Sequence, residues 1–104
     1  MTNLAIQTAF DVEIYLAWEE QQEEKHELIA GEVFAMAGAR REHVVVSGNL
    51  AVAFKQRLRG GPCQAYVASL KLRVEAVDAF FYPDVVVSCD PRDHAAGQFI
   101  AHPT

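Results

Sequence analysis

Apolar positions near the start of the chain recur at the spacing of a helix. Val12 and Tyr15 lie about one turn apart, and Thr8 precedes them as a candidate capping residue. Glutamates crowd the far end of this segment, where their charge opposes the helix dipole. We therefore expect an amphipathic helix within residues 10–24 that frays near Gln21.

The next stretch, KHELIAGEVFAMAG at residues 25–38, has two apolar-rich runs around a glycine. Gly31 can adopt the positive φ that a two-residue hairpin turn requires. Pairing across that turn sets Ile29 opposite Glu32 and continues outward residue by residue. Because side chains alternate along a strand, we expect Glu27 and Glu32 on the same face of the hairpin.

A second helix is expected from Arg41 onward. Its apolar side chains recur at every fourth residue, at Val46, Leu50, Phe54 and Leu58. Cations crowd its last turn, which suits the negative end of the helix dipole, and Gly60-Gly61-Pro62 ends it.

The remaining sequence is typical of strands. Residues 64–77 alternate imperfectly between apolar and polar side chains, and residues 80–89 form a second run that Pro83 can begin. The consecutive valines of residues 85–87 place apolar side chains on both faces of this run, which predicts a central strand. The predicted order is helix, hairpin, helix, strand, strand, which gives an α+β fold.

Composition favours a single folded domain. The 104 residues are 51% hydrophobic and 22% charged, so residues 1–104 can form one core. Cys63 and Cys89 form no CxxC pair, and the sequence contains no secretion signal and no apolar run of membrane length. We therefore expect reduced thiols, a cytoplasmic location and no membrane partner.

The net charge of −5 hides a division along the chain. Residues 1–39 carry −7, residues 40–73 carry +6 and residues 74–104 carry −4. A basic middle third can face phosphates while the acidic flanks repel them, although soluble surfaces often sort charge in this way. The candidates for a nucleic-acid-binding track are Arg40, Arg41, Lys55, Arg57 and Lys71.

Asp84 stands between Pro83 and the three valines. A carboxylate that enters a buried strand loses hydration, which is costly unless the group is hydrogen-bonded, paired or metal-bound. Two interpretations stay open. Asp84 is either a metal ligand whose approach Pro83 fixes, or a turn residue that accepts backbone N–H bonds.

Other polar residues also have two interpretations. Glu27 and Glu32 are candidate ligands for a hard divalent cation, which prefers oxygen atoms from several elements, or they are solvated residues at a sheet margin. None of the four histidines has the spacing of a zinc site. His43, in the first turn of the basic helix, is placed to contact a phosphate or a metal-bound water, or is a surface residue.

Three segments together resemble one family. They are HELIAGE at residues 26–32, the helix that opens with His43, and YPDVVVSCDPRD at residues 82–93. Over nearly its whole length the chain is similar to the Uma-type restriction endonucleases, a branch of the PD-(D/E)XK nucleases. His26 and Ala30 depart from the aromatic residue and the aspartate usual there, which weakens the turn rather than the site.

The resemblance implies a restriction-endonuclease-like mixed sheet with flanking helices. It also implies hydrolysis of DNA phosphodiesters with Mg²⁺ or Mn²⁺, which polarise the phosphate and lower the pKa of the attacking water. On this basis Asp84, His43 and Glu32 are catalytic candidates, and Asp84, Glu27 and Glu32 are candidate metal ligands.

In that family an apolar strand with a second acid, and a lysine near it, should follow a His-Pro-Thr-like stretch, whereas this sequence ends at Thr104. We therefore expect only the N-terminal part of the fold, weak metal binding and little or no cleavage by a single chain. An exposed sheet edge would favour a homo-oligomer. The alternative is a non-enzymatic scaffold that uses the sheet for dimerisation or partner binding.

Overall fold

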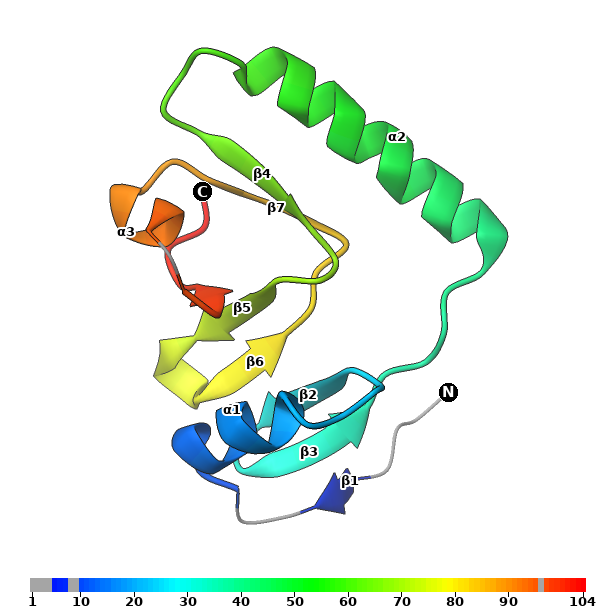
Figure 1. Ribbon diagram of the computed structural model, residues 1–104, viewed down its shortest axis with the longest axis vertical. Coiled ribbons are helices and arrows are strands. Elements are labelled where there is room, and N and C mark those ends of the chain that lie inside the picture. Colours follow the sequence, from blue (N-terminus) through cyan, green and yellow to red (C-terminus); the bar gives the residue numbers. More distant parts are fainter. Residues whose placement is uncertain (1–4, 8–9, 96) are drawn as a thin grey trace. The chain divides into compact units, whose positions relative to one another are not determined.

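The computed structural model describes residues 5–7, 10–95 and 97–104 (Figure 1). Two compact units divide the chain. The hairpin unit consists of Met1–Ala37 and Arg73–Phe81, and the helix unit consists of Gly38–Leu72 and Tyr82–Thr104. Within the described part of the chain, no helix is long and apolar enough to cross a membrane.

An antiparallel hairpin organises the hairpin unit. Strands β2 (His26–Ile29) and β3 (Glu32–Ala35) pair in the register expected from the sequence. Ala30 and Gly31 turn the chain with φ angles of 50° and 85°, as a two-residue turn of this kind requires. The predicted hairpin, including its register, is confirmed.

Two further strands and a helix complete this unit. Strand β1 (Ala5–Gln7) pairs with β3, and β6 (Ala79–Phe81) pairs with β2, which gives the order β1-β3-β2-β6. Helix α1 (Val12–Glu19) begins after Asp11, whose carboxylate accepts a backbone N–H from the first turn at 2.8 Å. Thr8, the expected cap, lies outside the described residues.

Side chains from α1, the hairpin and β6 form the core of the hairpin unit. Tyr15, Leu28, Val33 and Phe80 are almost completely buried. The ring centroids of Tyr15 and Phe80 lie 5.2 Å apart, and the Tyr15 hydroxyl donates to the carbonyl of His26 at 2.5 Å. These contacts fix α1 on the first strand of the hairpin.

The helix unit is built on a ladder of two strands. Strands β4 (Gln64–Val67) and β7 (Val85–Ser88) pair antiparallel, and helix α2 (Arg41–Leu58) packs mainly against β4 (Figure 1). The beginning of β5 (Lys71–Val74) pairs in parallel with β8 (Phe99–Ile100). Helices combined with antiparallel and parallel strand pairs confirm the predicted α+β class.

Both of the long strands expected in the second half of the chain are divided. The first run turns after β4, continues as β5 and ends in a 3-10 helix at Glu75–Val77. The second run separates into β6 and β7 around Pro83, which has no N–H to donate to a ladder. In the described structure β7 pairs with β4 in a ladder of two strands, so the prediction of a central strand is wrong.

The bounds of α2 match the prediction, but its buried side does not. Val46 and Leu50 of the expected apolar stripe are 66% and 48% exposed, and Phe54 is 37% exposed. Ala51 is buried instead, at 6% exposure. Much of the expected apolar stripe of α2 is therefore exposed to water.

The two cysteines form a disulfide, so the expectation of reduced thiols is wrong. The register of the ladder explains the pairing. Gln64 lies opposite Ser88, and the next positions outward are Cys63 and Cys89. In addition, residues 91–94 form the single-turn helix α3 (Pro91–His94) after β7.

Candidate active site

Asp84 and His43 come together in the helix unit. Asp84 lies between Pro83 and the first residue of β7, and His43 is the third residue of α2. The distance from His43 Nε2 to Asp84 Oδ1 is 2.9 Å. Two of the catalytic candidates predicted from the sequence are thus in direct contact.

The pair is open to water. The His43 and Asp84 side chains are 50% and 54% exposed. The expected desolvation of Asp84 is therefore wrong, because pairing of β7 begins only at the next residue. From this position the carboxylate can offer oxygen atoms to a cation, and the imidazole can donate or accept a proton.

Contacts further along α2 hold His43 in place. The hydroxyl of Ser47 donates to the carbonyl of His43 at 2.9 Å. Three turns into the helix, Lys55 Nζ donates to the carbonyl of Ala65 in β4, also at 2.9 Å. Because β4 pairs with β7, the helix that carries His43 and the strand that follows Asp84 are joined through one ladder.

Glu27 and Glu32 belong to the hairpin unit. The observed register places them on the same face of the hairpin, as the sequence predicted. Burial raises the pKa of Glu27, whereas Glu32 is exposed. Since both lie in a different unit from His43 and Asp84, their roles as metal ligands stay predictions.

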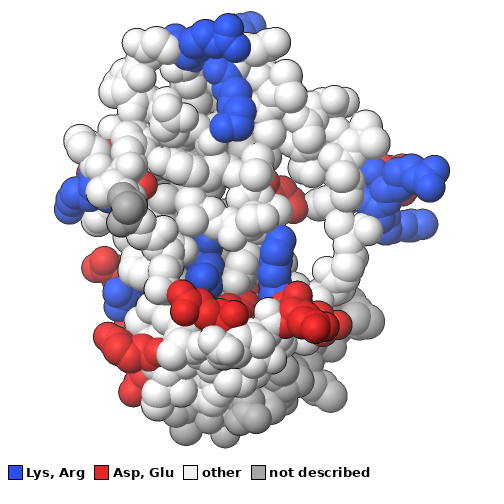
Figure 2. All heavy atoms as spheres, in the orientation of Figure 1, with Lys and Arg blue, Asp and Glu red and all other residues white. Residues whose placement is uncertain are grey.

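Exposed cations lie beside His43. Arg40 and Arg41 open α2 and are exposed, and Arg57 is exposed near the other end of this helix. In the face shown in Figure 2, Lys and Arg side chains gather toward the two ends of α2, and uncharged atoms occupy the stretch between them. The part of Arg40, Arg41 and Arg57 in nucleic-acid binding stays a prediction.

The two lysines of the expected track have partners within the protein. Lys55 Nζ donates a hydrogen bond to the carbonyl oxygen of Ala65. Lys71 Nζ lies 5.7 Å from the centroid of the Tyr82 ring, where a cation is attracted to the face of the ring. Both lysines therefore contribute to packing, and their part in nucleic-acid binding stays a prediction.

The His43–Asp84 pair is an incomplete metal site by itself. Within residues 10–95 and 97–104, no three His, Cys, Asp or Glu side chains converge in a group that could hold a metal ion. The pair supplies one carboxylate and one imidazole. Proteins commonly hold Mg²⁺ with one or two carboxylates together with waters and substrate phosphates. The two side chains therefore form no preformed cage, one carboxylate is compatible with a Mg²⁺ site of this kind, and the role of Asp84 as a metal ligand stays a prediction.

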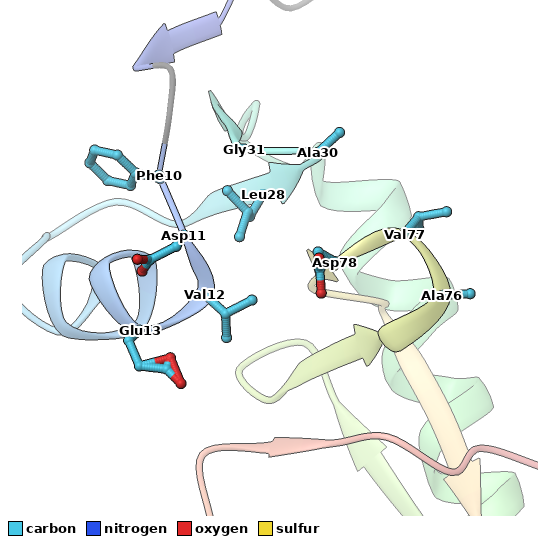
Figure 3. A pocket seen from close by; sticks show the side chains of 10 residues that line it. All are labelled: Phe10, Asp11, Val12, Glu13, Leu28, Ala30, Gly31, Ala76, Val77 and Asp78. Carbon is cyan, nitrogen blue, oxygen red and sulfur yellow. The ribbon is translucent and has the colours of Figure 1, made fainter.

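A pocket in the hairpin unit has a different character. Its volume is about 730 Å³, and it lies among the start of α1, the hairpin turn and the 3-10 helix (Figure 3). Leu28 and Val12 provide apolar lining, and the charged lining residues are Asp11, Glu13 and Asp78. Because the charged lining residues are all acidic, they repel phosphate, so this pocket does not suit a nucleic acid.

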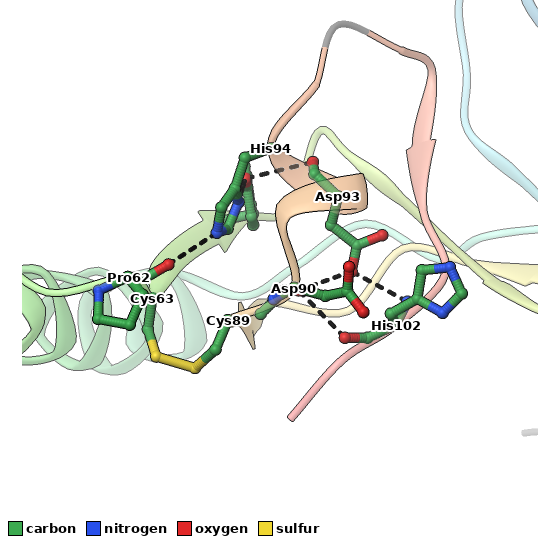
Figure 4. The surroundings of a disulfide bond; sticks show 9 residues. Pro62, Cys63, Cys89, Asp90, Asp93, His94 and His102 are labelled. Carbon is green, nitrogen blue, oxygen red and sulfur yellow. Dashed lines mark hydrogen bonds between the residues drawn. A yellow bond between two sulfur atoms is a disulfide. The ribbon is translucent and has the colours of Figure 1, made fainter.

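A structural role explains Asp93, the third residue of α3. Its Oδ1 accepts the Ala101 N–H at 2.9 Å, and its Oδ2 accepts the His102 N–H at 2.9 Å and the Ser88 hydroxyl at 2.6 Å (Figure 4). Burial raises the pKa of Asp93, but these hydrogen bonds together outweigh it and hold the pKa below its usual range. The carboxylate therefore fastens the C-terminal segment to the end of β7.

A second buried carboxylate, in the hairpin unit, was also missed. Glu19 Oε1 lies 2.8 Å from His26 Nδ1, and Glu19 Oε2 accepts the His26 backbone N–H at 2.7 Å. The Trp18 ring lies over this histidine, with 4.7 Å between ring centroids. The contact joins the end of α1 to the start of β2, and no sequence motif marks it.

Known proteins are similar to most of this chain. A family model, Uma2, described as "Putative restriction endonuclease", matches residues 12–104. "Uncharacterized protein slr1290" of Synechocystis sp. is 43% identical over 91 residues, which are 88% of this chain and 48% of that protein. "Uncharacterized protein sll1609" of the same organism is 34% identical over 73 residues, 70% of this chain and 41% of that protein. The chain thus spans about half the length, or less, of these curated relatives, and no solved structure matches it.

Proposed function

Because the chain belongs to the Uma2 restriction endonuclease family, we propose that its His43–Asp84 pair is the centre of a site for metal-dependent hydrolysis of DNA phosphodiesters. One observation carries the proposal. The 2.9 Å contact joins two residues that the sequence marked separately, one after a proline and one in the first turn of a basic helix. The DNA substrate, the metal and the cleavage reaction are all part of the proposal.

Each member of the pair has a distinct role in this proposal. Asp84 binds Mg²⁺ or Mn²⁺ through its carboxylate. When bound, the cation would polarise the scissile phosphate and activate a water. Asp84 would hold the cation, and the His43 imidazole would contact a phosphate oxygen or exchange a proton.

The arginines at the start of α2 support a phosphate-containing substrate. Arg40 and Arg41 are exposed next to His43, and phosphate contacts in protein–DNA complexes come largely from such side chains. The positive end of the α2 dipole adds to their field. We propose that this end of the helix faces the DNA backbone.

Cleavage by the 104-residue chain should be weak or absent. The pair contributes one carboxylate, whereas efficient metal-dependent hydrolysis commonly uses several oxygen ligands and often two metal ions. Glu27 and Glu32 remain the sequence-based candidates for further ligands, and no step is assigned to them.

A partner-binding scaffold is the second candidate function. It is favoured by the exposed apolar side chains of α2, since exposed apolar patches commonly mark binding surfaces. Homo-oligomers through the edge of β7 are less favoured than the sequence suggested. The Thr104 N–H donates to the Val87 carbonyl at 2.9 Å, so the chain itself uses part of that edge.

Calorimetric titration with Mn²⁺ tests the metal site directly. The wild-type protein should bind Mn²⁺, and Asp84→Ala should abolish binding. Glu42→Ala is the matched control, because it removes an exposed carboxylate next to His43 that has no part in the proposal. Absence of binding to the wild type, or equal losses in both variants, would refute the site.

Nuclease assays complete the test and separate the two candidate functions. Plasmid DNA is incubated with the wild type, Asp84→Ala and His43→Ala in Mn²⁺. Slow nicking that both substitutions remove supports the nuclease. No metal binding together with concentration-dependent dimerisation supports the scaffold.

A further inference from the structure

The Cys63–Cys89 disulfide and the candidate site lie at opposite ends of one ladder. Strands β4 and β7 pair over four positions that end at Gln64 and Ser88, and the disulfide follows directly (Figure 4). Asp84 directly precedes the first residue of β7 at the other end. The contacts that hold β4 against β7 therefore also affect the position of Asp84.

Helix α2 depends on the same ladder. A short loop, residues 59–62, leads from α2 to Cys63, and the bond from Lys55 to the Ala65 carbonyl fixes the helix on β4. His43 is thus attached to β4, whereas Asp84 is attached to β7. The distance between the two side chains depends on how β4 lies against β7.

We propose that the Cys63–Cys89 disulfide is a thiol-responsive clamp that holds His43 against Asp84 when closed and releases the pair when opened. The regulator is a small dithiol or a dithiol protein, with a disulfide as the opposing oxidant. This inference rests on the proposed function, because it concerns the regulation of the same site.

The restraints that remain after reduction are weak but present. A ladder of two short strands is only marginally stable in water. The His94 ring adds a non-covalent link, with Nε2 2.9 Å from the Pro62 carbonyl and Nδ1 2.7 Å from the Tyr66 hydroxyl. His94 is exposed, so water competes with both contacts. In the reduced protein the ladder and the His94 contacts would keep β4 near β7, while β4 and α2 would gain freedom relative to β7.

The clamp is accessible to its reductant. Cys63 and Cys89 are each only partly buried. A reductant thiolate attacks one sulfur, forms a mixed disulfide and expels the other cysteine as a thiolate. The second thiol of the reductant then displaces the first cysteine. Two electrons and two protons pass to the protein, which gains two thiols, and the reductant becomes a disulfide.

Nuclear magnetic resonance of the His43 ring tests the clamp in the whole chain. The Asp84→Asn substitution should shift the His43 ring signals in the oxidised protein and leave them nearly unchanged after reduction with dithiothreitol. Hydrogen exchange at residues 64–67 should accelerate by about a hundredfold on reduction, because the cross-link no longer restrains the loop it closes. The double variant Cys63→Ser/Cys89→Ser should resemble the reduced wild type in both buffers.

Three results would overturn the clamp. The first is an equal response of His43 to Asp84→Asn in both redox states. The second is complete loss of far-ultraviolet circular dichroism on reduction, because the disulfide would then be a structural staple. The third is persistence of free thiols in the presence of a disulfide oxidant. These measurements need neither metal nor DNA. If the His43 response depends on the redox state as expected but the protein does not bind Mn²⁺, the nuclease site is refuted and the clamp is not.

Discussion

Two aspartates at opposite ends of β7 should respond very differently to the loss of their charge. Asp84→Asn alters a half-exposed side chain before the strand, and Asp93→Asn alters a buried side chain after it. We expect Asp93→Asn to lower the free energy of unfolding strongly and Asp84→Asn to lower it little. The comparison tests whether Asp84 stabilises the fold or is available to bind a ligand.

The magnitude at Asp93 follows from its three donors. An asparagine can keep its carbonyl oxygen toward the Ser88 hydroxyl and the His102 N–H, which preserves two of the three hydrogen bonds. Its NH₂ group then faces the Ala101 N–H, and two donors oppose each other. Loss of a hydrogen bond to a charged group, with a donor left unsatisfied, costs about 2–3 kcal/mol.

The magnitude at Asp84 follows from its exposure. The contact with His43 is short, at 2.9 Å, but about half of each side chain meets water. Solvent screens such a pair and holding two side chains in one geometry costs entropy, so exposed pairs contribute about 0.2–1 kcal/mol. An asparagine can still accept a hydrogen bond from the imidazole, which reduces the loss further.

Urea unfolding at pH 7, with the disulfide intact, measures both effects. For an unfolding slope of about 1–2 kcal/mol per molar urea, Asp93→Asn should lower the midpoint by roughly 1–3 M and Asp84→Asn by less than half of that. Asp90→Asn is the control, because Asp90 lies on the same turn and asparagine caps α3 equally well. A loss above about 2 kcal/mol at Asp84 would refute our reasoning and make it a turn residue required by the fold.

Three further predictions concern stability. The depressed pKa of Asp93 means that its contribution is complete above the unfolded-state pKa of about 3.9 and disappears as the pH falls through the folded-state pKa. Urea midpoints of the wild type and Asp93→Asn should therefore converge on acidification, and a constant difference down to low pH would contradict this assignment. Reduction of Cys63–Cys89, which are 26 positions apart, should lower the free energy of unfolding by about 3.5 kcal/mol in urea melts with and without dithiothreitol. Glu19→Gln should cost about 2 kcal/mol in a thermal melt, because glutamine replaces the charged acceptor of both contacts with His26 by a neutral amide, whereas a neutral outcome would show that the charge of this buried pair does not stabilise α1.

Local signals were sufficient to predict the hairpin. A glycine that adopts positive φ, flanked by alternating side chains, fixes both the turn and the register, and the observed pairs match the expectation. The bounds of α2 were predictable for the same reason, since its periodicity and the glycines after Leu58 are local features. Elements defined within one segment of chain were therefore accessible from the sequence.

Features that depend on pairing between segments distant in the sequence could not be predicted from it. The disulfide follows from the register between β4 and β7, and the partners of Asp93 come partly from the C-terminal segment. The exposure of Asp84 has the same origin, because the sequence does not reveal where pairing of the strand begins. The sequence thus marked His43 and Asp84 separately, whereas neither their contact nor their exposure could be predicted from it.

The His43–Asp84 contact is expected to contribute little to the free energy of unfolding, and this small contribution is relevant to function. A carboxylate held by several backbone donors, such as Asp93, has its oxygen atoms committed and would lose stability if a cation displaced them. Asp84 instead accepts from an exposed imidazole, which a cation can displace at a cost of about 1 kcal/mol or less. Asp84 directly precedes a paired strand and His43 lies in a helix, while both side chains are about half exposed. A carboxylate that binds a ligand needs a backbone in a fixed position and oxygen atoms that no strong hydrogen bonds already occupy.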